Sequence, residues 1–236
     1  MNYQVVVVAA GQGSRMGADR NKVLLPLKGT PVIIHTLRIF EKDPCCEGIV
    51  LVVRESERDL FRGLLEKYGI HKVVALAAGG SERQESVFNG LKSLKSSDDR
   101  IVLVHDGARP FIDRRRIAGV VEAADKHGAA LLAVPVKDTI KQVDSGEVRK
   151  TLERKSLWAA QTPQAFRLSV ILRAYREGAD RHFMATDDAS LVEEMGMLVV
   201  TVSGSYRNIK LTTPEDMIIA EKFLEEEKED ACGPRI

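Results

Sequence analysis

The sequence has few cysteines and no long apolar run, and each shortage excludes a class of protein. Only three cysteines occur among its 236 residues, Cys45, Cys46 and Cys232, and no two have C-x-x-C spacing. Neither a disulfide framework nor a cysteine zinc site is therefore expected. One of the longest apolar runs, Val5 to Ala10, is far shorter than the ~20 residues that cross a bilayer. We expect a protein without membrane spans, located in the reducing cytoplasm.

The chain also lacks a surplus of charge of either sign. Its 35 basic and 34 acidic residues leave a net charge of +1, which argues against an extended surface for nucleic-acid phosphates. No nucleic-acid partner is expected. Since 44% of the residues are hydrophobic, the chain can bury a full core, and residues 1–236 are expected to form a single domain.

Short β-rich segments alternate with amphipathic helical segments along the chain. The expected strands are Tyr3–Ala9, Gly48–Val53, Val73–Leu76, Ile101–Val104, Ala129–Val134 and Leu198–Val202. The expected helices include Val32–Glu41, Glu57–Lys67, Arg83–Lys95 and Arg114–Lys126. Nearly continuous apolar strands are typical of a mostly parallel sheet with helices on both faces, so the fold class is α/β.

Residues 136–157 interrupt this alternation. The segment reads as a β-hairpin around the turn-forming DSGE of residues 144–147. A hairpin that projects from a sheet buries little surface in its own monomer, so a partner subunit is the expected cover and an exposed edge flap is the alternative. The lone Trp158, just after it, is expected to be a packing residue rather than a functional one.

A glycine-rich loop, AAGQGSRMG at residues 9–17, follows the first expected strand. Ligands bind beyond the carboxyl ends of strands in open parallel sheets. Small residues let backbone N–H groups approach an anion, and Arg15 and Lys22 add positive charge on two sides. The loop therefore predicts a ligand that carries phosphates.

Three other interpretations compete with phosphate binding, and the first two are disfavoured. A dinucleotide-binding fingerprint should begin a helix at once and be followed by an acidic residue about 20 positions on, but Pro26 and Pro31 intervene. The Walker pattern of P-loop proteins is absent. The third interpretation is a glycine-rich connection without a ligand.

Two further segments combine a strand end with polar residues. VLVHDGARPF, residues 102–111, places Asp106 at a strand's carboxyl end, where it could support a magnesium ion bound mainly by nucleotide phosphates or simply form an Asx-turn. GGSERQESV, residues 79–87, leads into a helix N-terminus that could hold an anion or a base edge. Ordinary capping, with Ser81 paired to Gln84, explains Ser81 equally well, and Ser86 could reach a nucleobase or bond its own backbone.

Seven ordered motifs together resemble one family, the 2-C-methyl-D-erythritol 4-phosphate cytidylyltransferases. They are AAGQGSRMG with Lys22, GGSERQESV, VHDGARPF, PVKDT, AQTPQAF, ATDDAS and NIKLTTPEDM. The resemblance covers nearly the whole chain. It implies a Rossmann-like fold, a homodimer held by a protruding β-arm, and magnesium as cofactor. It also implies transfer of CMP from CTP to methylerythritol phosphate in the non-mevalonate route to isoprenoids.

The resemblance assigns a role to individual residues. For the triphosphate it implies a backbone cradle at Ala9, Ala10, Gly11 and Gly13, with Arg15 and Lys22 stabilising the growing charge. For cytidine it implies Gly80, Ser81 and Ser86, and for the metal Asp106. For methylerythritol phosphate it implies Arg109, Thr139, Arg154, Thr162 and Lys210, with Arg154 and Lys210 aiming it for attack.

Some members of the family have a carboxylate at the positions of Ser81 and Arg207. A missing carboxylate at 207 removes a second acidic support for a metal. Thr139 lies on the expected arm, so the resemblance implies a site completed by the second subunit. The alternatives are a ribitol 5-phosphate cytidylyltransferase, a non-catalytic CTP-binding module and an NAD-dependent oxidoreductase, the last weakened by the missing acidic ribose ligand.

Overall fold

A seven-stranded sheet forms the centre of the computed structural model, which describes residues 1–11, 21–94 and 99–231, with side chains to residue 226. The strand order is β11-β7-β10-β6-β1-β4-β5. The strands are β1 (Tyr3–Val8), β4 (Cys46–Val53), β5 (Val73–Ala78), β6 (Ile101–Asp106), β7 (Ala129–Pro135), β10 (Trp158–Arg167) and β11 (Val200–Ser203). All run in the same direction except β10, which is antiparallel to both neighbours. The expected α/β class with a mostly parallel sheet is confirmed.

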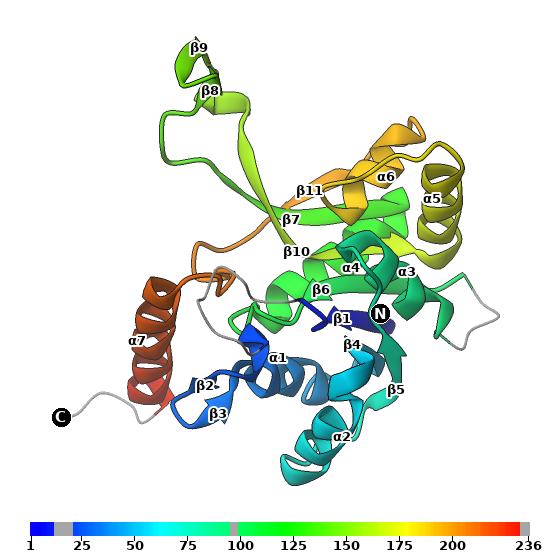
Figure 1. Ribbon diagram of the computed structural model, residues 1–236, viewed down its shortest axis with the longest axis vertical. Coiled ribbons are helices and arrows are strands. Elements are labelled where there is room, and N and C mark those ends of the chain that lie inside the picture. Colours follow the sequence, from blue (N-terminus) through cyan, green and yellow to red (C-terminus); the bar gives the residue numbers. More distant parts are fainter. Residues whose placement is uncertain (12–20, 95–98, 232–236) are drawn as a thin grey trace.

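Helices cover both faces of this sheet (Figure 1). One face carries α1 (Val32–Glu41), α2 (Arg58–Lys67) and α4 (Arg114–His127), and the other carries α3 (Arg83–Lys92), α5 (Leu168–Asp180) and α6 (Asp188–Glu194). Val5 and Val7 of β1 pack into the first core, whereas Val6 packs into the second. A strand buried on both faces needs no polar alternation, which explains the uninterrupted valines.

Strand β10 had no counterpart among the expected strands, because its sequence does not alternate. It carries Gln161 and Gln164 at buried positions, and its pairing with β7 is irregular between them. The amide of Gln161 donates to the Ser205 carbonyl at 2.8 Å, and that of Gln164 donates to Asp187 at 2.8 Å. These distant partners make a polar strand stable inside the sheet.

The β-arm is present as β8 (Lys141–Asp144) and β9 (Glu147–Thr151), a two-stranded sheet that projects from the body (Figure 1). Its turn residues Ser145 and Gly146 have φ of 51° and 84°, as the twist of a two-residue hairpin turn requires. Both valines of the hairpin, Val143 and Val148, are more than half exposed. Trp158, the first residue of β10, lies at the base of the arm and is 45% exposed.

A third apolar cluster joins the C-terminal helix to the body. Helix α7 (Pro214–Ala231) packs near the short hairpin of β2 (Pro26–Leu27) and β3 (Thr30–Pro31), with Leu27 and Ala220 buried between them. Reciprocal hydrogen bonds cap its start: the N–H of Asp216 donates to the Thr213 hydroxyl, and the Asp216 carboxylate accepts from the N–H of Thr213. No helix within the described ranges is long and apolar enough to cross a membrane.

Candidate active site

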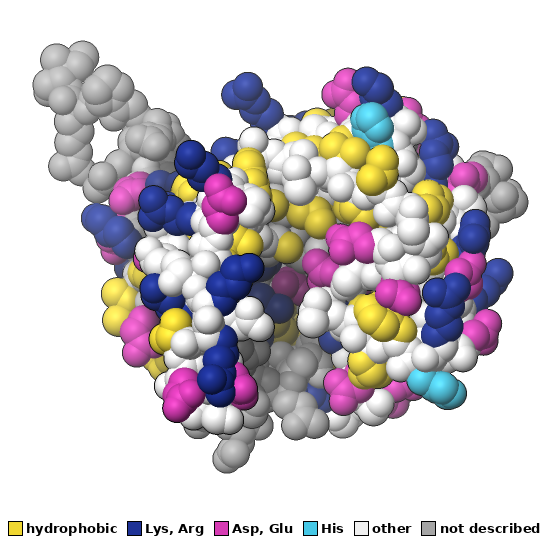
Figure 2. Space-filling model, turned by 90° about the horizontal axis from the view of Figure 1, so that it is seen from above, with side chains coloured by type: hydrophobic (Ala, Val, Ile, Leu, Met, Phe, Trp, Pro, Cys, Tyr) yellow, Lys and Arg dark blue, Asp and Glu magenta, His cyan; other side chains and the backbone are white. Residues whose placement is uncertain are grey.

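A cavity of about 430 Å³ lies where β1, β4, β5 and β6 end, at the carboxyl edge of the sheet. Its lining includes these expected residues: Ala9, Ala10, Gly11, Lys22, Gly80, Ser81, Ser86, Asp106 and Lys210. Figure 2 shows a hollow near the middle of the visible face, with basic and acidic side chains inside it. The structure thus brings the three segments singled out in the sequence together in one place.

The first loop enters this cavity directly from β1. The N–H of Ala9 still donates to the Val52 carbonyl of β4 at 2.8 Å, so the start of the loop is an extension of the sheet. Among the described residues, no atom lies within 4 Å of a Cβ built on Gly11. Lys22 begins a short 3-10 helix, η2 (Lys22–Leu24), at the far end of the loop. Gly13 and Arg15 lie outside the described residues.

Asp106 is the centre of charge in the cavity. Its carboxylate lies 2.9 Å from Lys210 Nζ, 3.5 Å from Arg109 Nε and 3.6 Å from Arg83 Nε. Burial alone would raise the pKa of Asp106, but the charges of Lys210, Arg83 and Arg109 outweigh burial and hold its pKa well below the usual range. The carboxylate is therefore ionised at any physiological pH.

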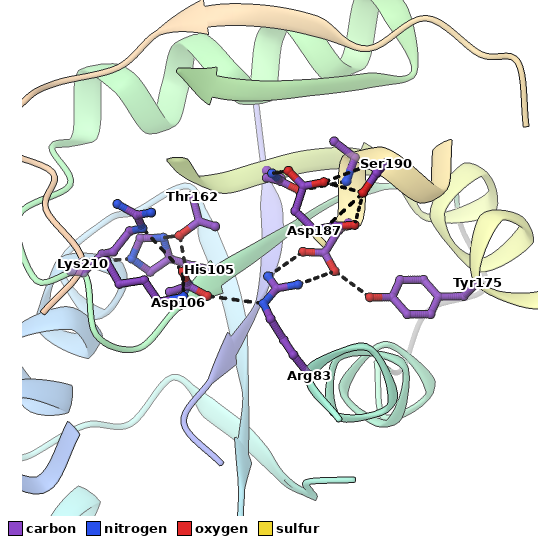
Figure 3. A network of polar contacts seen from close by, with 12 residues as sticks. Arg83, His105, Asp106, Thr162, Tyr175, Asp187, Ser190 and Lys210 are labelled. Carbon is purple, nitrogen blue, oxygen red and sulfur yellow. Dashed lines mark hydrogen bonds and ion pairs between the residues drawn. The ribbon is translucent and has the colours of Figure 1, made fainter. Parts of the chain in front are cut away.

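Behind Asp106, a chain of hydrogen bonds joins β6 to β10 (Figure 3). The Thr162 hydroxyl accepts from the backbone N–H of Asp106 at 3.0 Å and lies 3.2 Å from His105 Nδ1. His105 Nε2 lies 3.1 Å from the Arg109 carbonyl. Since a carbonyl only accepts, Nε2 carries the proton and Nδ1 accepts from Thr162. Burial lowers the pKa of His105 to about 4, against a smaller opposing effect of the Arg109 carbonyl.

Residues 79–86 form the second loop of the cavity, between β5 and α3. The Ser86 hydroxyl accepts from the Gly80 N–H at 2.9 Å and donates to the Glu82 carbonyl at 3.0 Å, so it bonds its own backbone. The Ser81–Gln84 capping prediction was wrong, because α3 begins at Arg83 and both the N–H and the hydroxyl of Ser81 donate to Glu85. A Cβ on Gly80 would lie 2.4 Å from the Glu85 side chain, so tight packing requires glycine there.

Arg83 links this loop to a buried acidic group (Figure 3). Its guanidinium makes two contacts with Asp188, at 2.7 and 3.2 Å, and Asp188 also accepts from the Tyr175 hydroxyl at 2.6 Å. Asp188 is fully buried. This arrangement fixes the guanidinium plane and leaves its Nε toward Asp106.

Thr139 and Arg154 are not brought to the cavity of their own protomer. Both belong to the arm segment and are exposed. The Arg154 guanidinium donates to the Lys137 carbonyl at 2.9 Å within the arm. Arg109 and Thr162 contact Asp106 from behind without lining the cavity.

Arg207 pairs with Glu226 of α7 at 2.7 Å and its guanidinium lies 4.3 Å from the Phe223 ring, so it anchors α7.

The donor set suits a magnesium ion carried by phosphates rather than a metal held by protein alone. Within the described residues, no group of three or more histidine, cysteine, aspartate or glutamate side chains could hold a metal. Magnesium in nucleotide enzymes usually needs only one or two carboxylates beside the substrate phosphates. Asp106, ionised and lining the cavity, meets that requirement.

Among the cavity residues to which the sequence assigned no role are three polar ones, Asn21, Arg54 and Arg83. Arg54 follows β4 directly, so the rule that ligands bind beyond strand ends could have pointed to it. Arg83 stands inside a segment singled out for its glycines and serines. Nothing local distinguishes Asn21.

A glycine-rich loop, a second loop before a helix and several cations at the carboxyl edge of a Rossmann-like sheet define a nucleotidyltransferase. The model of the 2-C-methyl-D-erythritol 4-phosphate cytidylyltransferase family matches residues 3–226. This chain belongs to that family.

Individual relatives agree with this assignment over nearly the full length. The 2-C-methyl-D-erythritol 4-phosphate cytidylyltransferase of Bacillus licheniformis is 54% identical over 228 residues, covering 97% of this chain and 98% of the relative. That of Geobacillus thermodenitrificans is 55% identical over 224 residues, covering 95% and 97%. The solved 4-diphosphocytidyl-2C-methyl-D-erythritol synthase of Anaerococcus prevotii superimposes with a TM-score of 0.82 at 32% identity, covering 95% of this chain and 96% of that one.

Proposed function

We propose that this protein transfers CMP from CTP to 2-C-methyl-D-erythritol 4-phosphate, with release of pyrophosphate, in non-mevalonate isoprenoid biosynthesis. The observation that carries the proposal is the cavity itself. It combines a backbone loop of small residues with cations from three separate segments, Lys22, Arg83 and Lys210, in a chain that belongs to this family.

The reaction needs alignment and charge neutralisation more than proton transfer. An oxygen of the methylerythritol phosphate attacks the α-phosphorus of CTP, an O–P bond forms, and the bond from that phosphorus to the pyrophosphate oxygen breaks. A phosphate dianion is already a nucleophile near neutral pH, so no general base is required. Two anionic reactants must be held together while charge grows on the leaving group. Lys22 serves the triphosphate and Lys210 the acceptor phosphate, and the resemblance gives Arg15 the same task as Lys22.

Two loops share the recognition of CTP. The backbone of Ala9, Ala10 and Gly11 cradles the triphosphate, because small residues leave N–H groups accessible to phosphate oxygens. The loop at Gly80 and Ser81 receives the cytidine, and Ser86 shapes that loop by its two backbone hydrogen bonds. Asp106 would hold the magnesium ion, which, when bound, neutralises phosphate charge and orients the leaving pyrophosphate.

A second copy of the chain completes the acceptor site. Thr139 and Arg154 stand on the projecting arm, outside the cavity of their own protomer. The exposed Val143 and Val148 of the hairpin, together with Trp158, give the arm an apolar surface that another copy can cover. The assembly is a homodimer in which Arg109, Thr162 and Lys210 of one protomer meet the arm of the other.

The protein works in the cytoplasm. Both substrates are phosphorylated metabolites of the cell interior. The two described cysteines, Cys45 and Cys46, are free thiols, which suits a reducing compartment.

Pyrophosphate release from purified protein tests the function. CTP and magnesium are supplied with methylerythritol 4-phosphate, with ribitol 5-phosphate, or without an acceptor, and a parallel set contains EDTA. Release only with methylerythritol 4-phosphate, abolished by EDTA, is expected. Preference for ribitol 5-phosphate would transfer the protein to the sister activity. A folded protein that binds CTP but releases nothing would be a binding module.

A further inference from the structure

We propose that Arg54, Asn21 and Glu57 form a bracket that positions the backbone of the triphosphate loop. The inference rests on the proposed function, because it assigns these three residues to the CTP end of that site. Asn21 and Arg54 line the cavity, and neither belongs to the motifs that carry the family resemblance.

Side chains of the bracket hold three consecutive carbonyls of the loop. The Asn21 amide donates to the Ala9 carbonyl at 2.6 Å. Arg54 donates through Nε to the Ala10 carbonyl at 3.2 Å and through Nη2 to the Gly11 carbonyl at 2.9 Å. The loop backbone is thus held by groups outside its own segment, before any ligand arrives.

Glu57 joins the two donors. Its Oε2 accepts from the Asn21 amide at 2.9 Å, and its Oε1 lies 3.9 Å from Arg54 Nη1. The Glu57 side chain is 15% exposed, and Asn21 is fully buried. Asn21 also caps the 3-10 helix that begins with Lys22. Asn21 therefore connects the two ends of the loop: its amide bonds the Ala9 carbonyl at the start, and Lys22 follows it at the end.

The planarity of the peptide unit turns these contacts into a function. In a trans peptide the N–H of the next residue points opposite to the carbonyl. Holding the carbonyls of Ala9 and Ala10 fixes the directions of the N–H groups of Ala10 and Gly11, the donors that a phosphate needs. A carbonyl held by Arg54 also cannot turn toward the ligand and repel it. The bracket preorganises the cradle, so the loop loses little conformational entropy when CTP binds.

Arg54 acts through the loop rather than on the nucleotide. Two of its nitrogens donate to carbonyls and the third lies toward Glu57. Arg54 is therefore a positioning residue, and its loss should weaken CTP binding without affecting the acceptor.

The experiment compares Arg54→Met, Arg54→Lys and Glu57→Gln with a matched control, Arg58→Met. Arg58 also joins a carboxylate and a carbonyl, those of Glu55 and Leu76, and its exposure is 28% against 30% for Arg54. It does not line the cavity. Each variant is measured for the CTP dissociation constant by equilibrium dialysis and for KM of CTP, KM of the acceptor and kcat by pyrophosphate release.

Arg54→Met is expected to raise the dissociation constant and KM for CTP at least about tenfold, with KM of the acceptor within about twofold of wild type. Arg54→Lys should recover part of the loss, Glu57→Gln should raise the CTP constants about threefold, and Arg58→Met should bind CTP as wild type does. Equal CTP binding in Arg54→Met and Arg58→Met would overturn the bracket. So would a rise in both KM values together, or a loss in Arg54→Met with Glu57→Gln unaffected, which would mean direct contact with the nucleotide.

Failure of the proposed function has a different signature. Wild-type protein would then release no pyrophosphate with any acceptor. Equilibrium dialysis would still measure the CTP dissociation constants, so the wild type and the variants could still be compared. If Arg54→Met does not fold, Arg54→Lys and Glu57→Gln decide the question by the same two measurements.

Discussion

The Thr162 hydroxyl lies 3.2 Å from Nδ1 of His105, and this contact joins two residues that are 57 positions apart in the sequence. Thr162 accepts from the Asp106 N–H and donates to Nδ1, so both ring nitrogens are in use in the neutral form. Burial disfavours a second proton on the ring, because the charged form would lose its hydration, and so lowers the pKa of His105. The backbone N–H of Asp106 is thus bonded to a neutral network, while its carboxylate lies near the cations of Lys210, Arg109 and Arg83.

This neutral histidine predicts a loss of stability in mild acid. The pKa of His105 is lowered by burial from 6.5 to about 4, so between these values the unfolded chain binds a proton that the folded chain does not. Stability is therefore complete above pH 6.5 and falls as the pH drops toward 4, by at most about 3 kcal/mol from this residue. Urea unfolding at pH 7.5 and 5.0 measures the difference.

The matched variants separate His105 from other groups. His105→Gln keeps a donor for the Arg109 carbonyl and should flatten the pH dependence. Burial also lowers the pKa of His35, so a smaller loss of stability in acid should persist in His105→Gln. His71 is exposed, and His71→Gln should reproduce the wild-type profile. An unchanged slope in His105→Gln would contradict the assignment.

Lys22 predicts a large kinetic effect with little effect on the fold. It lines the cavity at the end of the triphosphate loop, and removal of a preorganised charge at such a site costs at least about 100-fold in turnover. Lys22→Ala should show this loss in pyrophosphate release while its thermal midpoint stays close to that of wild type. Lys42→Ala, which removes an exposed lysine after α1, should turn over normally. Near wild-type turnover in Lys22→Ala would remove the residue from its role.

The Arg83–Asp188 pair predicts a stability effect larger than that of a surface pair. Asp188 is fully buried and accepts from Arg83 and from Tyr175. Removing one partner of such a pair leaves a buried charge uncompensated and costs roughly 3 kcal/mol. Arg83→Met should therefore lower the free energy of unfolding in urea by about that amount.

A surface pair provides the comparison. Arg181 and Glu194 are 56% and 44% exposed and lie 3.6 Å apart, and such pairs contribute about 0–1 kcal/mol. Arg181→Met should unfold nearly as wild type does. If Arg83→Met lowers the free energy of unfolding no more than Arg181→Met does, the Arg83–Asp188 pair does not stabilise the fold.

The arm predicts the state of assembly. Val143 and Val148 are 54% and 59% exposed in the protomer, and a homodimer would cover them. Val143→Asp combined with Val148→Asp should give a folded monomer in analytical ultracentrifugation, with pyrophosphate release reduced because Thr139 and Arg154 no longer reach a second cavity. Leu198 is 86% exposed outside the arm, and Leu198→Asp should remain a dimer. A double variant that still sediments as a dimer would place the interface elsewhere.

Much of the fold could be predicted because its signals are local. The valines of β1 and the turn at Ser145 and Gly146 identify a doubly covered strand and a hairpin from neighbouring residues alone. Strand β10 could not be predicted in this way. Its buried glutamines are satisfied by Ser205 and Asp187, and the pattern that usually marks a strand is absent.

The sequence by itself determined the family, the glycine loops after the strands and about half of the residues that line the cavity, because motif order and spacing are properties of the chain. Only the tertiary structure decided which charges meet. Arg83 and Asp188 are 105 positions apart, and Arg54 reaches Gly11 from the end of another strand. Such contacts depend on the order of the strands in the sheet and on the exclusion of water from the space between the paired side chains. No short segment of the sequence determines either of these.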